Sequence, residues 1–181
     1  MARYRLFTAI DLPGETMAEL AALDRNLKGA RWVPRDQLHL TLRFIGDADE
    51  NMFQRIRQAL GMIRRAPFHL TLRGTGHFPP GKDPRVLWVG MEKNPALAEL
   101  QENVERGVIA AGIPAEVRRF SPHITLARLR NGSPKEVDEW EQRHAAFREL
   151  VVPVEEFHLY SSTLTRDGAI HRREATFPLG G

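Results

Sequence analysis

The stretch QLHLTLRFIG, residues 37–46, alternates apolar and polar side chains as a half-buried β-strand does. Its tetrapeptide HLTL, residues 39–42, returns unchanged at residues 69–72, and the near-copy HITL occupies residues 123–126. In a strand, residues i and i+2 point to the same face, so each His-x-Thr presents an imidazole and a hydroxyl together. Short motifs also arise by chance, and the context of each copy must decide which ones form a site.

An internal repeat distinguishes two of the three copies. The helix expected after His39 has a stripe of residues that lie 14, 17, 21 and 24 positions after that histidine. A second stripe lies at the same four distances after His123. The two stripes are Phe53, Ile56, Leu60 and Ile63, and Val137, Trp140, His144 and Phe147. Each unit continues into a strand that begins Phe-His-Leu, at Phe68 and at Phe157. His39 therefore matches His123, whereas His69 matches His158 and is predicted to be an ordinary strand residue.

The chain is predicted to run strand, helix, His-x-Thr strand, helix, strand, twice over. Seven strands are expected, at residues 4–12, 38–46, 68–74, 85–91, 123–129, 157–165 and 169–177. Helices are expected at Pro13–Lys28, Asn51–Arg64, Pro95–Ala111 and Pro134–Phe147. Asn94-Pro95 and Ser133-Pro134 are good helix starts, and Gly29 and Gly112 are expected to end two of the helices.

Composition indicates one compact domain over residues 1–181, because 181 residues with 42% hydrophobic content can bury a sizeable core. With no cysteine, disulfides, thiolate metal sites and a cysteine nucleophile are excluded. No apolar run approaches 18 residues, and the first residues resemble a strand entering a turn instead of a leader. We therefore expect a cytoplasmic protein without a membrane segment.

Arginines surround the third motif. Residues 118–130 contain four Arg and no acidic residue. A solvated surface is one interpretation of such a cluster. The other is an anionic, phosphate-bearing ligand, because the guanidinium group binds phosphate in a bidentate manner.

Two facing units would place two His and two Thr around one centre. Near neutral pH one imidazole can act as a base and the other as an acid, as in-line displacement at phosphorus requires. The Thr hydroxyls can donate to the non-bridging oxygens of the phosphoryl group. This scheme requires neither a metal nor a cofactor, and neither motif has an acidic neighbour at the spacing of a metal site.

Two segments carry a resemblance to a known family. Trp32-Val33 before LHLTLRFIG, and FSPHITLAR at residues 120–128, closely resemble the two-histidine (2H) phosphoesterases, and among them the RNA 2',3'-cyclic phosphodiesterases, historically called 2'-5' RNA ligases. The similarity extends through GHFPPGKDPRVLWVG, residues 76–90. It implies an α+β fold of two pseudo-twofold lobes, in which antiparallel sheets form a central cleft and helices lie outside.

The same resemblance implies hydrolysis of RNA 2',3'-cyclic phosphate ends to 2'-phosphates without metal, with reversible 2'-5' ligation as a further activity. It matches His39 and His123 to the catalytic pair. His39 is the favoured acid and His123 the favoured base, although the pseudo-symmetry of the two units leaves the reverse assignment open. Thr41, Thr125 and Arg128 match phosphate-binding positions, and Phe44 matches a residue that stacks on the terminal base. The implied partner is RNA or a cyclic nucleotide, and no obligate protein partner is evident.

Other functions remain open at this point. A 2H enzyme acting on ADP-ribose 1'',2''-cyclic phosphate or on 2'-5' oligonucleotides would use the same residues. A non-catalytic module that binds RNA ends or nucleotides would also need the Arg and Thr, although it would not need a matched acid and base.

The remaining aromatic and histidine residues are interpreted as structural. Trp88 and Trp140 are expected in the core, and His144 is expected on the apolar stripe of its helix. His77 is expected in a loop, and a place at the border of the cleft is the less favoured interpretation of it. His171 follows the Asp167-Gly168 turn and is expected to be exposed.

Overall fold

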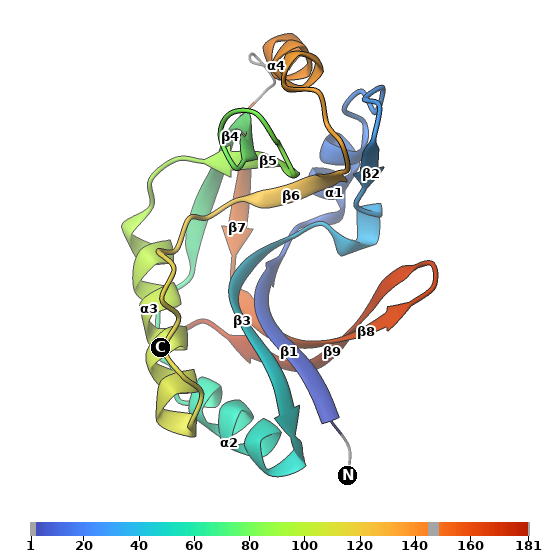
Figure 1. Ribbon diagram of the computed structural model, residues 1–181. Coiled ribbons are helices and arrows are strands. Elements are labelled where there is room, and N and C mark those ends of the chain that lie inside the picture. The colour runs from blue at the N-terminus through green and yellow to red at the C-terminus, as the bar shows by residue number, and fades with distance from the viewer. Residues whose placement is uncertain (1–2, 145–148, 181) are drawn as a thin grey trace.

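The computed structural model describes residues 3–144 and 149–180, and these residues form nine strands in one antiparallel sheet (Figure 1). The strands are β1 (Arg3–Asp11), β2 (Ala30–Trp32), β3 (His39–Asp49), β4 (Phe68–Phe78), β5 (Val86–Met91), β6 (Ile124–Leu129), β7 (Leu150–Val154), β8 (Glu156–Thr165) and β9 (Gly168–Pro178). Their order is β7-β4-β5-β6-β3-β1-β8-β9, and β2 pairs with β6.

The sheet consists of two lobes that meet between β3 and β6. A single pair of residues, Leu40 and Ile124, joins these two strands. The first lobe contains β1, β3, β8 and β9, and the second contains β2, β4, β5, β6 and β7. Counted outward from the junction, β3 matches β6, β1 matches β5, and β8 matches β4. The predicted duplicated α+β fold is confirmed, and His69 and His158 lie on matching strands.

Four helices flank the sheet: α1 (Gly14–Ala21), α2 (Glu50–Gly61), α3 (Pro95–Ala111) and α4 (Pro134–Arg143), with a short 3-10 turn at Arg35–Gln37. The predicted start signals act as expected. The side chains of Asn94 and Ser133 accept hydrogen bonds from the backbone N–H three residues on. Helix α3 ends where Gly112 takes a positive φ of 116°.

Three predicted helices are shorter than expected. Helix α2 ends at Gly61 instead of Arg64, so Ile63 lies beyond it. Helix α1 ends at Ala21 instead of Lys28, so Gly29 does not end it. Helix α4 ends at Arg143, and Phe147, the last residue of its predicted stripe, lies outside the described residues.

Two strands were missed by the sequence prediction. Strand β2 has only three residues, too few to show alternation. Strand β7 contains Pro153, which argues against a strand inside a sheet. The structure places β7 at the edge of the sheet, where the missing N–H of proline is tolerated.

The predicted apolar stripes form the core. Helix α2 buries Phe53, Ile56 and Leu60, and α4 buries Val137 and Trp140. The apolar alternates of both motifs are buried as predicted: Leu40, Leu42, Ile124 and Leu126. Across the described stretches 3–144 and 149–180, we find no helix long and apolar enough to cross a membrane.

Candidate active site

Both motifs converge where the lobes meet. Because Leu40 pairs with Ile124 in antiparallel register, His39 lies across from Thr125, and Thr41 lies across from His123. Leu40 and Ile124 are fully buried, whereas all four motif residues are half-buried on the opposite face. The junction therefore brings two imidazoles and two hydroxyls to one face of the sheet.

A β-bulge in each lobe adds a further residue to this face. Strand β3 has an extra residue, Leu42, opposite the Thr8–Ala9 step of β1, and a second, Ile45, farther along the same pair of strands. Strand β6 has the extra residue Leu126 opposite β5. A bulge shifts the alternation of the strand by one residue. Phe44 and Arg128, five residues after their motif histidines, are consequently exposed on the histidine side. Phe44 is 58% exposed, so its ring does not fill the core.

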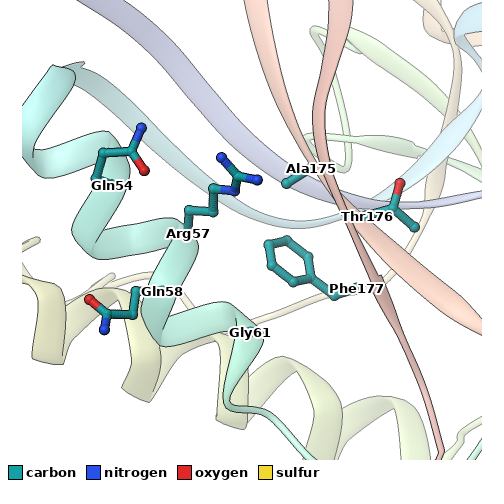
Figure 2. A pocket seen from close by; sticks show the side chains of 7 residues that line it. All are labelled: Gln54, Arg57, Gln58, Gly61, Ala175, Thr176 and Phe177. Atoms are coloured by element: carbon teal, nitrogen blue, oxygen red, sulfur yellow. The ribbon is translucent and has the colours of Figure 1, made fainter.

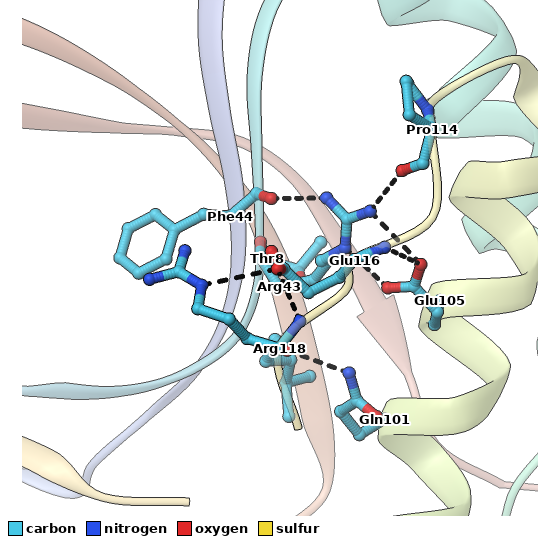
Figure 3. Close-up of polar contacts among 9 residues, drawn as sticks. Thr8, Arg43, Phe44, Gln101, Glu105, Pro114, Glu116 and Arg118 are labelled. Atoms are coloured by element: carbon cyan, nitrogen blue, oxygen red, sulfur yellow. Dashed lines mark hydrogen bonds and ion pairs between the residues drawn. The ribbon is translucent and has the colours of Figure 1, made fainter. Parts of the chain in front are cut away.

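Side chains satisfy the backbone of the first bulge (Figure 3). The carbonyl oxygen of Leu42 accepts a hydrogen bond from Gln101 Nε2, and that of Arg43 accepts from Thr8 Oγ1. The carbonyl oxygen of Phe44 accepts from the guanidinium of Arg43 at 2.6 Å. Because buried carbonyls without partners are costly, these contacts stabilise the backbone that presents Phe44.

His123 is held in one tautomer. Its Nδ1 lies 2.7 Å from the carbonyl oxygen of Ser121, which can only accept, so Nδ1 carries the hydrogen. The Nε2 atom of the neutral ring is then free to accept a proton. The ring of Phe78 contacts His123 edge to face, with 5.0 Å between the ring centroids.

His39 lies in an aromatic cluster contributed by β1, β8 and β9. Its ring stacks on Phe7, with centroids 5.2 Å apart, and on Tyr160 at 6.3 Å. His171 approaches His39 edge-on at 5.5 Å. Burial, together with the nearby His171 and Arg128, lowers the pKa of His39 to about 4. His39 is therefore neutral in the free protein at neutral pH.

A cavity of about 700 Å³ borders His39, between the first lobe and the end of β7 at Pro153 and Val154. Asp11 organises its polar wall, because it accepts hydrogen bonds from Tyr160 at 2.6 Å and from Arg173. His158 Nε2 lies 3.4 Å from the same carboxylate. Burial, and then the hydrogen bond to Asp11, raises the pKa of Tyr160 to about 12, so its hydroxyl stays protonated.

A second depression, of about 500 Å³, lies between α2 and β9 (Figure 2). Arg57 of the helix extends toward Ala175 and Phe177 of β9, and Gln54, Gln58, Gly61 and Thr176 complete the lining. None of the predicted site residues lines it, and its lining offers neither a histidine nor a carboxylate. It is not the candidate active site.

Three sequence predictions about single residues need correction. His171 is half-buried because its ring packs against His39 and Phe7. His77 lies in β4 instead of a loop. Trp88 is only half-buried and pairs with Thr125, so it lies beside the site. The Trp88 ring covers Gly76, and a Cβ atom at Gly76 would lie 2.3 Å from that ring. The predicted burial of Trp140 is confirmed, and His144 stacks on its ring.

Sequence reasoning missed several neighbours of the site. Phe7 and Tyr160 contact His39 but have no motif that marks them. Arg31 of β2 lies directly opposite Arg128 of β6. Like charges at facing positions repel, and an anion bound near both guanidinium groups would relieve this repulsion. The only sequence signal for Arg31 is its place just before the Trp32-Val33 pair.

Comparison with known proteins shows the family of the chain. The family described as "LigT like Phosphoesterase" matches residues 10–88 and again residues 89–171, which are the two repeat units. The chain belongs to the LigT-like phosphoesterase family. The double match also supports the internal repeat found in the sequence.

Individual relatives cover nearly the whole chain. A Thermotoga maritima protein named RNA 2',3'-cyclic phosphodiesterase is 34% identical over 93% of this chain and 91% of its own length. The crystal structure of LigT from E. coli with 3'-AMP superposes with a TM-score of 0.80 at 29% identity, covering 99% of this chain and all of that one. A crystal structure from Thermus thermophilus has a TM-score of 0.80 at 34% identity and covers 97% of both chains.

Proposed function

We propose that this LigT-like phosphoesterase hydrolyses RNA 2',3'-cyclic phosphate ends to 2'-phosphates by paired histidine catalysis without metal. The observation that carries the proposal is the Leu40–Ile124 pair, since it gathers His39, Thr41, His123 and Thr125 on one face. The printed names of the relatives support RNA with a cyclic phosphate end as the substrate. Ligation of 2'-5' RNA ends would be the same displacement at phosphorus, with the 5'-hydroxyl of a second RNA end attacking in place of water and O3' again leaving.

The substrate phosphate would lie between the two motifs. Thr41 and Thr125 would donate hydrogen bonds to its non-bridging oxygens, and Arg128 would neutralise its charge. His123 Nε2 would take a proton from the attacking water, because Nδ1 is already bonded to Ser121. His39 would donate a proton to the ribose O3' as the P–O3' bond breaks.

The lowered pKa of His39 affects its assignment as the acid. An acid must carry a proton, and burial removes the proton from His39 in the free protein at neutral pH. An anion beside an imidazole favours its charged form. The negatively charged phosphate would therefore raise the pKa of His39 on binding, so that proton uptake accompanies substrate binding.

The proposed function is tested with cytidine 2',3'-cyclic phosphate in the presence of EDTA. We expect multiple turnovers at an undiminished rate, because all proton transfers are assigned to histidines. Product is measured by chromatography. Binding without turnover would favour a non-catalytic nucleotide-binding module, and loss of activity that zinc or manganese restores would favour metal catalysis.

The product should be a single isomer. Water attacks phosphorus opposite the leaving oxygen, and a cleft with one imidazole on each side fixes which ribose oxygen leaves. We expect the 2'-phosphate, identified by phosphorus NMR against authentic 2'- and 3'-nucleotides. A predominant 3'-phosphate would mean that the ribose binds in the reverse orientation, and a mixture would mean that the histidines do not orient it.

Phe44 is expected to bind the terminal base. Its exposed ring lies on the histidine side of β3, and stacking on one base contributes about 1–3 kcal/mol. Phe44→Ala should weaken binding of a nucleotide by that amount in calorimetry, whereas Phe44→Tyr should retain it. Affinity that is unchanged in Phe44→Ala would remove Phe44 from the site.

A further inference from the structure

A second cluster of titratable side chains lies away from the motifs, between β4 and α4. It consists of His77, Asp138 and Glu141, and their ligand atoms all lie within 4.8 Å of one another. Phe78, the next residue in β4, faces His123, so His77 points to the opposite face of the strand. Figure 1 shows α4 at the β4–β5 end of the second lobe.

The contacts within this cluster leave negative charge unbalanced. His77 Nδ1 donates to Glu141 Oε1 at 2.6 Å, and the two side chains are only 15% and 21% exposed. Asp138 and Glu141 are three residues apart on α4, so their carboxylates share one side of the helix and repel each other. Among the described contacts neither carboxylate forms an ion pair with Lys or Arg.

We propose that His77, Asp138 and Glu141 form a binding site for a divalent zinc ion that joins α4 to β4. Zinc binds His nitrogen and carboxylate oxygen at about 2.0–2.2 Å, which places neighbouring ligands about 3.4 Å apart in a tetrahedron. Side-chain rotations bring atoms within 4.8 Å to that spacing, with the His77–Glu141 hydrogen bond replaced by two metal bonds. Water would complete the coordination, and the ion would balance both carboxylates.

The chemistry of the donors selects the metal. Imidazole suits zinc, whereas magnesium prefers oxygen ligands and retains its water. The ion would link a strand to a helix on the outer side of the second lobe. Its effect should therefore be on stability and not on turnover, which is compatible with catalysis in EDTA.

The decisive experiment titrates metal-free protein with Zn²⁺ by calorimetry and compares Asp138→Asn with Glu139→Gln. Asp138 forms no described hydrogen bond and repels Glu141, so Asp138→Asn should leave the metal-free melting temperature the same or slightly higher while weakening zinc binding at least about tenfold. Glu139→Gln, an exposed neighbour on α4, should bind zinc as the wild type does. Zinc should raise the melting temperature of the wild type and of Glu139→Gln, and Mg²⁺ should not.

Zinc can also bind the histidines of the cleft, and the titration must separate the two places. Binding that survives in Asp138→Asn but disappears in His39→Asn would belong to the cleft and would overturn the proposal. Equal zinc affinity in Asp138→Asn and wild type would do the same. Turnover of the cyclic nucleotide is measured separately and should be normal in Asp138→Asn, so the failure of either proposal is recognised independently.

Discussion

His39→Ala and His123→Ala should each lower the rate of cyclic phosphate hydrolysis by roughly 10²–10⁴-fold, the usual contribution of a positioned acid or base. The two residues act on one phosphate from facing strands, so the double variant should be little slower than either single variant. Single-turnover rates with cytidine 2',3'-cyclic phosphate measure the effect, and circular dichroism checks that each variant is folded.

His69→Ala is the matched control, because His69 begins an identical HLTL tetrapeptide. Its side chain is exposed on β4, two strands away from the junction, and its rate should stay within a few-fold of the wild type. If His69→Ala were as slow as His39→Ala, the assignment of the two units would be wrong. His39→Asn repeats the test with less loss of packing, since His39 is partly buried among aromatic rings.

Arg43→Met should lower the free energy of unfolding by about 3–5 kcal/mol, because it leaves a partly buried carboxylate without its partner. Arg43 is 6% exposed, and its guanidinium contacts Glu105 at 2.5 Å and the carbonyl oxygen of Pro114 at 2.7 Å (Figure 3). Burial raises the pKa of Glu105, but the hydrogen bonds from Arg43 and from the Glu116 N–H outweigh it and lower the pKa. Urea unfolding followed by fluorescence measures the loss.

Arg65→Met supplies the comparison. Arg65 pairs with Glu99 on the surface, where both side chains are exposed, and such pairs contribute at most about 1 kcal/mol. Adding Glu105→Gln to Arg43→Met should recover part of the lost stability by removing the unpaired charge. A loss below about 1 kcal/mol in Arg43→Met would show that solvent already screens Glu105.

Arg43 also links stability to the site. Its guanidinium donates to the carbonyl oxygen of Phe44, and its own carbonyl accepts from Thr8. Removing the guanidinium should therefore loosen the bulge that presents Phe44 as well as the contact with α3.

The sequence by itself determined the features that depend on local periodicity and on end signals. Helix α3 has the predicted bounds, because Asn94, Pro95 and Gly112 mark its ends through local hydrogen bonds and backbone geometry. The shared phase of two apolar stripes distinguished His39 and His123 from His69. Apolar alternation correctly placed Leu40 and Ile124 in the core.

Only the tertiary structure decided what lies around the histidines. Strict alternation along β3 would put Arg43 on the site face and Phe44 in the core. The extra residue Leu42 exchanges the faces of these two side chains. That extra residue is defined only by the pairing of β3 with β1. Phe7, Tyr160 and His171 reach His39 from strands distant in sequence, and their burial of its ring sets its pKa. Register and desolvation arise from contacts between distant segments, which no local pattern encodes.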